Sequence, residues 1–293
     1  MHTTVQPRPV FAALLIVSLL ISGSGNAQAA ESAVAITLER TACFRTCPIY
    51  TVTIYEDGTV IYHGENFVTV TGEQTSSIDP ETVKLMVAAF EEAGYFSWDE
   101  AYDTRTVSDL PTVITSVTVN GQQHRIARYA GDSSAPLALP FLEQWIDLMA
   151  QTAQWTGAQF DFTAISVGEQ SPVVTLQRGP CFGACPIYNV AAFEDGTVVY
   201  VGIANVTKIG VVVLQTDAAT IELIAQMAQA SGYFKWEDRY QYMTITDQST
   251  VITSIRWEDQ YKTIVHYEGD LNAPIGLVRI EQSIEALVTS LVG

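Results

Sequence analysis

Basic side chains are scarce in this sequence of 293 residues. Lys and Arg number 14 against 32 Asp and Glu, which gives a formal net charge of -18. Such an acidic chain repels phosphate backbones, so we expect no nucleic-acid partner. Glycine and proline, at 19 and 11 residues, are too few for a collagen-like or low-complexity chain. What the chain does contain is 48% hydrophobic and only 16% charged residues, a composition typical of globular proteins that bury a core.

An uncharged apolar run lies near the N-terminus, from Phe11 to Ile21, between Arg8 and a small-residue stretch that ends at Ala29. Its eleven residues are fewer than the ~20 that a membrane-spanning helix needs. A basic leader, a short apolar run and small residues at the end are typical of a secretory signal peptide. We therefore predict a signal peptide over residues 1–30, cleaved near Ala29, and a secreted or periplasmic mature chain without a membrane span.

The rest of the sequence consists of two copies of one unit. The motif Cys-Phe-x-x-Cys-Pro-Ile-Tyr at Cys43 returns 138 positions later at Cys181, and the offset holds without a gap. Residues 36–146 paired with 174–284 give roughly 40% identity. A period of this size is a whole domain with its own core rather than a solenoid repeat. We predict a first repeat domain over 31–152, a linker over 153–170 and a second repeat domain over 171–293.

Within each copy, alternating apolar residues predict strands, and turn and cap residues divide them. In the first copy the sequence predicts a hairpin around Asp57-Gly58, a strand near 67–71, a helix from Asp79-Pro80 to Gly94, a hairpin around Asn120-Gly121 and a second helix after Pro136. Strands outnumber helices and do not alternate with them strictly. We therefore predict an α+β fold of two homologous domains, each a mainly antiparallel sheet with two helices on one face.

One run of residues carries a resemblance. Cys43-Phe44-x-x-Cys47-Pro48-x-Tyr50, followed by Asp57-Gly58-Thr59-Val60-x-Tyr62-x-Gly64, resembles the start of the bacterial domain of unknown function numbered 6438. The second copy matches as well. The resemblance implies secretion and duplication, and it names no catalytic residue.

The four cysteines admit two functions. In an exported chain, Cys43 with Cys47 and Cys181 with Cys185 predict one structural disulfide in each copy. The alternative is a thiol protein that carries copper or exchanges disulfides, because Cys-x-x-x-Cys-Pro is similar to the copper-carrying pair of Sco-type chaperones. Arg40 and Arg178 are the cations that such thiolates would need. The copies share no histidine, however, since His63 aligns with Val201, His124 with Lys262 and Arg128 with His266.

The shared polar and aromatic residues predict a binding surface rather than a catalytic site. A shared histidine, a phosphate loop and a dinucleotide motif are all missing, so we predict no catalytic, cofactor-binding or metal-binding residues. The shared Glu143 is expected on the solvent-exposed face of the second helix. We expect a non-enzymatic binding or envelope-associated module whose partner is a protein, glycan or small molecule of the envelope or exterior. The candidate surface residues are Arg40, Tyr50, Tyr62, Arg178, Tyr188 and Tyr200.

Overall fold

The computed structural model of the chain describes residues 1–2, 32–104, 109–158, 165 and 170–293. The signal peptide predicted over residues 1–30 lies outside this part, apart from its first two residues, and so does most of the predicted linker beyond residue 158. Residues 32–293 form one unit. Among the described helices, none combines the length and apolar composition that crossing a membrane requires.

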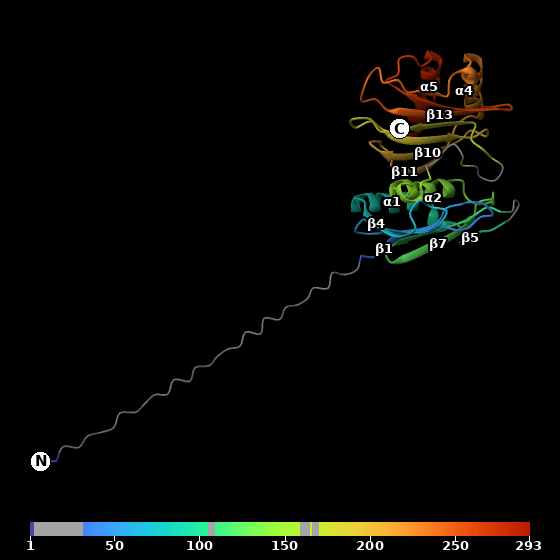
Figure 1. The fold of residues 1–293 in the computed structure, drawn as a ribbon. Helices are drawn as coiled ribbons and strands as arrows, with labels where there is room; N and C mark the ends of the chain where they lie inside the picture. Colours follow the sequence, from blue (N-terminus) through green and yellow to red (C-terminus); the bar gives the residue numbers. More distant parts are fainter. Residues whose placement is uncertain (3–31, 105–108, 159–164, 166–169) are drawn as a thin grey trace. The chain divides into compact units, whose positions relative to one another are not determined.

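The first half of this unit is a mainly antiparallel sheet with helices on one face, as the sequence predicts (Figure 1). In the described part its strands run in the order β4-β3-β2-β1-β6-β7-β5, where the short β5 pairs in parallel with β7. The elements are β1 (Val34–Arg40), β2 (Ile49–Tyr55), β3 (Thr59–Asn66), β4 (Gly72–Ser77), α1 (Pro80–Glu92), η1 (Tyr95–Ser97), β5 (Ala101–Tyr102), β6 (Thr112–Val119), β7 (Gln122–Tyr129), α2 (Ala138–Met149) and α3 (Ala153–Thr156).

Both predicted hairpins of the first half are confirmed. Gly58 joins β2 to β3 with a φ of 87°, a conformation that glycine adopts without strain. Asn120 and Gly121 join β6 to β7 with φ values of 51° and 77°, as a two-residue turn of the I′ type requires. These turns fix the register of the alternating strands, so that one face of the sheet is apolar.

The strand predicted near residues 67–71 is wrong, because β4 begins only at Gly72. Phe67 has a φ of 54°, which ends the extended backbone of β3. The N–H of Val70 then donates to the carbonyl of Trp155 at 2.8 Å, so this segment bonds to α3 instead of to a neighbouring strand.

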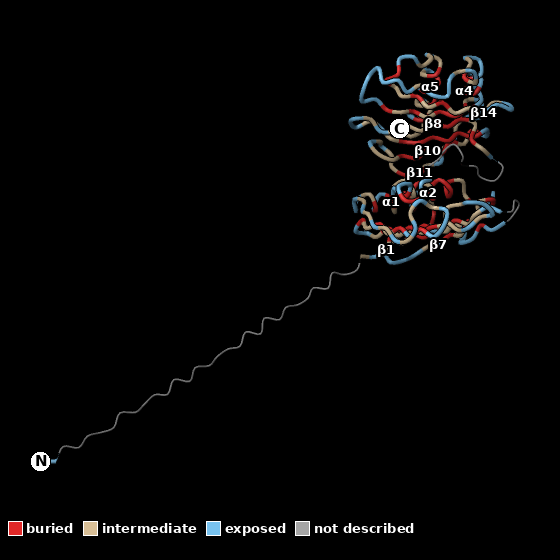
Figure 2. Tube along the Cα trace, in the orientation of Figure 1, coloured by how far each residue is buried: buried red, intermediate tan, exposed pale blue. Residues whose placement is uncertain are grey.

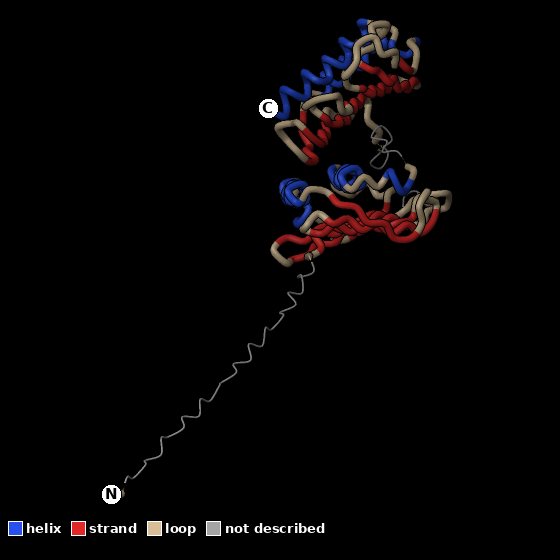
Figure 3. The backbone as a smooth tube through the Cα atoms, turned by 60° about the vertical axis from the view of Figure 1, so that its left-hand side comes forward, coloured by secondary structure: helices blue, strands red, loops and turns tan. Residues whose placement is uncertain are grey.

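The helices of the first half are held by a cap and by apolar contacts with the sheet. Asp79 caps α1 by accepting from the N–H of Glu81 at 2.9 Å, as predicted. Met86 and Phe90 of α1 and Trp145 of α2 have no exposed surface. Figure 3 shows both helices on the same side of the first sheet.

The second half repeats this plan, with the strand order β11-β10-β9-β8-β13-β14-β12 in the part that is described. Its last helix continues to residue 292, where the first half has α2 and α3 as separate helices. The elements are β8 (Val174–Arg178), β9 (Ile187–Ala192), β10 (Thr197–Ala204), β11 (Gly210–Gln215), α4 (Ala218–Ser231), η3 (Tyr233–Lys235), β12 (Arg239–Tyr240), β13 (Thr250–Trp257), β14 (Gln260–Tyr267) and α5 (Ile275–Val292).

The core of the first half extends into the second half. Phe193, Val199 and Val201 are buried in the cluster that also holds the helices of the first half. Val201 stands where the first copy has the exposed His63, so the face that is polar in the first sheet is apolar in the second. Figure 2 shows buried residues along β8 and β10. We expected a separate core in each copy, but α1 and α2 pack on the outer face of the second sheet as well as on their own.

A glycine permits this close approach. Gly210 opens β11 with a φ of 103°, and a Cβ atom placed there would lie 2.5 Å from the Cβ atom of Ala89 in α1. Phe141 of α2 meets Phe193 edge to face, with ring centroids 6.5 Å apart.

Candidate binding site

All four cysteines form disulfides within their own half. Cys43 bonds to Cys47 and Cys181 bonds to Cys185, each with Cα atoms 5.8 Å apart. The pairing expected from the duplication is therefore present. Each disulfide closes a short loop that leads into a strand, β2 in the first half and β9 in the second. The phenylalanine that follows the first cysteine of each loop is strongly exposed, Phe44 at 80% and Phe182 at 86%.

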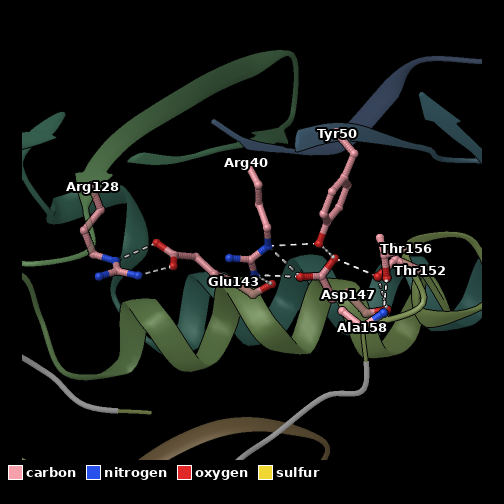
Figure 4. Close-up of polar contacts among 8 residues, drawn as sticks. All are labelled: Arg40, Tyr50, Arg128, Glu143, Asp147, Thr152, Thr156 and Ala158. Atoms are coloured by element: carbon pink, nitrogen blue, oxygen red, sulfur yellow. Dashed lines mark hydrogen bonds and ion pairs between the residues drawn. The ribbon is translucent and has the colours of Figure 1, made fainter. Parts of the chain in front are cut away.

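Two of the candidate residues of the first half, Arg40 and Tyr50, lie side by side because they are cross-strand partners of β1 and β2 (Figure 4). The Nε atom of Arg40 donates to the hydroxyl of Tyr50 at 3.0 Å and to Asp147 Oδ2 at 2.9 Å. The Tyr50 hydroxyl donates in turn to Asp147 Oδ1 at 2.7 Å. Thr152 donates to the same oxygen at 2.9 Å, so both oxygens of the Asp147 carboxylate are bonded.

These contacts fix the protonation states of the group. Burial alone would lower the pKa of the Arg40 guanidinium, but the neighbouring Asp147, Tyr50 and Glu143 outweigh this effect and raise it. Burial, and then the negative charge of Asp147, raise the pKa of Tyr50 well above its usual value. Arg40 therefore stays charged and Tyr50 stays a neutral hydrogen-bond donor. The positive charge of Arg40 is balanced by the negative charge of Asp147.

This group forms one wall of a cleft of about 530 Å³ in the first half. Pro48, next to the disulfide loop, and Leu148 of α2 add apolar surface to the lining. The other side chains of the lining bear amides and hydroxyls or are small: Gln144, Gln151, Gln154, Thr152, Thr156, Ala153 and Ala158.

The second half has the same arrangement with different partners. Arg178 and Tyr188 are again cross-strand neighbours. Arg178 donates to Glu285 Oε1 at 2.5 Å and to Glu268 Oε2 at 2.7 Å, and Tyr188 donates to Glu285 Oε1 at 3.3 Å. Burial and the charge of Glu285 raise the pKa of Tyr188. Arg178, Tyr188 and Glu285 line a cleft of about 460 Å³ together with Tyr200.

The remaining candidate residues, Tyr62 and Tyr200, differ between the halves. Tyr62 is completely buried because Trp155 stacks on it, with ring centroids 5.0 Å apart and an interplanar angle of 27°. Trp155 reaches that place because Gln151, with a φ of 55°, interrupts the helix and starts α3. In the second half α5 continues instead, and Tyr200 lines the cleft although it is only 3% exposed, so the surface position expected for it is also wrong. Burial raises its pKa to about 12.

The expectation that Glu143 lies on the solvent-exposed face of its helix is wrong. Its side chain is 1% exposed, and Arg128 binds both of its oxygens, with Nε donating to Oε1 at 2.8 Å and Nη2 to Oε2 at 2.5 Å (Figure 4). The equivalent pair in the second half is His266 and Glu281, joined from Nδ1 to Oε2 at 2.8 Å. The sequence did contain a signal for these buried pairs. The two glutamates are equivalent in the duplication, and so are Arg128 and His266, which bind them.

No cluster of three or more His, Cys, Asp or Glu side chains that would hold a metal ion occurs among the described residues. Among the described residues, the hydrogen bonds of Arg40 and Arg178 go to carboxylates, one hydroxyl and a carbonyl, and none of them joins a cysteine sulfur.

Comparison with known proteins identifies a family. The model of a domain of unknown function, DUF6438, matches the chain twice, over residues 34–150 and 172–288. Among curated proteins, none matches the chain. The two matches coincide with the two structural halves, and each includes an Arg-Tyr pair and a disulfide loop.

Proposed function

The chain belongs to the DUF6438 family, of which it carries two tandem copies, and we propose that it is an exported, non-enzymatic binding module of the cell envelope or exterior. Its ligand is neutral and rich in hydroxyl groups, as a glycan is, and binds in the cleft of the first half. Export rests on the leader over residues 1–30, with its apolar run and its small-residue end.

The composition of the first cleft carries the choice of ligand. Arg40 and Asp147 neutralise one another's charge, so a charged ligand would have to compete with a partly buried ion pair on this wall. The side chains left for a ligand are the amides of Gln144, Gln151 and Gln154. An amide both donates and accepts hydrogen bonds, which is what a hydroxyl-bearing ligand also does.

Apolar surface accompanies these amides. Pro48 and Leu148 offer contact for the C–H faces of a sugar ring, and the exposed Phe44 lies four residues before Pro48 on the disulfide loop. Pockets that combine apolar walls with a few placed polar groups are typical binding sites for small molecules. The disulfide holds the loop in place before the ligand arrives, which lowers the entropic cost of binding.

Binding is tested with the chain that lacks residues 1–30 on an array of neutral and charged glycans, followed by calorimetric titration of the oligosaccharide retained most strongly. The double change Gln151→Ala with Gln154→Ala should weaken that binding at least tenfold. Thr289→Ala is the matched control, because Thr289 takes the place of Gln151 in the second half and lines the other cleft. Retention of acidic glycans alone, or unchanged binding by the double variant, would contradict the proposal.

Export is tested separately by expressing the full chain in a Gram-negative host and fractionating the cells. The expected product is periplasmic or extracellular, with an N-terminus near Ala30 by mass spectrometry. An intact chain in the cytoplasm would contradict export without affecting the binding result.

A further inference from the structure

The second half contains a cavity of about 540 Å³ that differs in charge from the corresponding place in the first half. Four carboxylates line it, two of them next to β14 and two from α5: Glu268, Asp270, Glu281 and Glu285. None of the side chains in its lining is Lys or Arg, and His266 is the one nitrogen base among them. This cavity is distinct from the cleft of the first half to which we assign the neutral ligand.

The duplication shows what has changed. In the first half, Arg128 fills the corresponding place and satisfies both oxygens of Glu143. In the second half, the shorter His266 stands at the position of Arg128 and bonds to only one oxygen of Glu281. The other carboxylate oxygen of Glu281, Oε1, is buried and has no hydrogen-bond partner among the described residues. Glu268 adds a further carboxylate where the first half has Ala130.

A buried carboxylate oxygen without a partner is costly, so native proteins rarely leave one unpaired. The side chain of Glu281 is only 6% exposed, and burial raises the pKa of its carboxyl. Arg178 binds Glu268 and Glu285, and in the described part of the chain Glu281 has only His266 as a hydrogen-bond partner. The cavity therefore lacks the positive group that the first half supplies from its own chain.

We propose that this cavity binds an alkylguanidinium cation, whose charged end takes the place beside Glu281 that Arg128 takes beside Glu143. A guanidinium is planar and has donors on both edges of one fork, so it matches a carboxylate in two places. It is also more weakly hydrated than an ammonium ion, which favours it at a buried oxygen. The carboxylates are not grouped closely enough to hold a metal ion in the described residues, whereas a larger organic cation can reach several of them.

The walls accommodate the alkyl part of such a ligand. Val278 and Ala273 line the cavity, and Leu271 and Ile275 are each 66% exposed. The same chemistry is present in a free alkylguanidine and in an arginine side chain of a peptide. Both are therefore included in the test.

Binding is measured by calorimetry at pH 7.5 with the chain that lacks residues 1–30, using ethylguanidinium, its neutral isostere ethylurea, and the peptide Gly-Arg-Gly. We expect ethylguanidinium to bind and ethylurea to bind at least tenfold more weakly, and the ring protons of His266 to shift in NMR spectra during the titration. Tighter binding of Gly-Arg-Gly than of ethylguanidinium would assign the site to arginine side chains, and weaker binding would assign it to free alkylguanidines.

Three variants locate the site. His266→Arg restores the residue of the first half, so it should fold and should lose the binding at least tenfold, because its own guanidinium occupies Glu281. Glu281→Gln should weaken binding to a similar extent. Glu222→Gln removes an exposed acid of α4 and should leave binding unchanged.

The proposal is overturned if the wild-type chain does not distinguish ethylguanidinium from ethylurea, or if His266→Arg binds the cation as tightly as the wild-type chain does. Urea denaturation of each variant checks its folding without any ligand, so failure here and failure of the proposed function are separable.

Discussion

Arg128 and His266 take the same place in the two halves, and each binds the glutamate that follows it by 15 residues. The two pairs are nevertheless not equivalent, because the arginine satisfies both oxygens of its carboxylate and the histidine satisfies one. Duplication thus provides an internal comparison, in which the first half shows the fully paired state of a site that is incomplete in the second.

The first pair is expected to be sensitive to the loss of one partner. Arg128→Met leaves the carboxylate of Glu143, which is 1% exposed, without its cation, and should lower the free energy of unfolding by about 3–5 kcal/mol. The double variant Arg128→Met with Glu143→Leu should recover most of that loss, since no buried charge remains. Urea denaturation measures both. Lys84→Met, at a strongly exposed pair with Glu81, is the control and should cause no measurable change. Equal losses in the single and double variants would contradict this prediction.

The second pair predicts a pH dependence. Burial raises the pKa of Glu281 above its usual value of 4.5, and the hydrogen bond from His266 opposes this only in part. Glu268 and Glu285 raise the pKa further through their negative charge. Because the folded state prefers the protonated carboxyl, its contribution to stability is fully present below pH 4.5 and is lost as the pH rises through the raised pKa.

Glu281→Gln removes this titration. The stability of the variant relative to the wild-type chain should therefore increase between pH 4.5 and pH 8, as measured by urea denaturation at a series of pH values. If the difference in stability between the two chains stayed constant over that range, the carboxyl of Glu281 would not have a raised pKa in the folded state.

The disulfides are expected to act as structural cross-links. Replacing Cys43 and Cys47 by serine should lower the free energy of unfolding by about 2 kcal/mol, because the closed loop is short. The same change at Cys181 and Cys185 should have a similar effect. Titration of free thiols in the natively purified chain should detect none, and metal analysis should detect no copper. Free thiols or bound copper would instead support the thiol protein that the sequence left as an alternative.

The contact between the halves is expected to depend on the outer face of the second sheet, where apolar residues replace polar residues of the first copy. Val201→His introduces the residue of the first copy at a completely buried position, which should cost about 2 kcal/mol or more because the imidazole finds no solvent there. His63→Val is the matched control at an exposed position and should change stability little. Thermal or urea denaturation measures both. A similar small effect at the two positions would mean that the second sheet does not use this face for packing.

Much of the fold could be predicted from local signals. The turns at Gly58 and at Asn120-Gly121 need a backbone conformation that few residues adopt, and the cap at Asp79 satisfies an N–H that the helix leaves open. The strand expected near residues 67–71 is wrong because this segment depends on a distant contact. The hydrogen-bond partner of Val70 is Trp155, which lies far along the chain.

The candidate site was predicted only in part. Arg40 and Tyr50 could be paired because β1 and β2 are neighbours and the duplication repeats both residues. Their common partner Asp147 was missed, because the equivalent residue in the second copy is a glutamate, Glu285. Tyr62 was expected at the surface, but the break at Gln151 brings Trp155 over its ring.

The duplication, the disulfide loops, the turns and the helix cap could all be predicted from the amino-acid order, because each depends on residues that are close together or repeated at one offset. Which faces are buried and which charges are paired depends on how the helices and sheets pack in space. A helix such as α2, which packs against its own sheet and against the sheet of the second half, buries residues such as Glu143 that an isolated amphipathic helix would expose to water. The cost of burying a carboxylate then makes its partner in space decisive, and that partner follows from the packing of the elements rather than from their order in the chain.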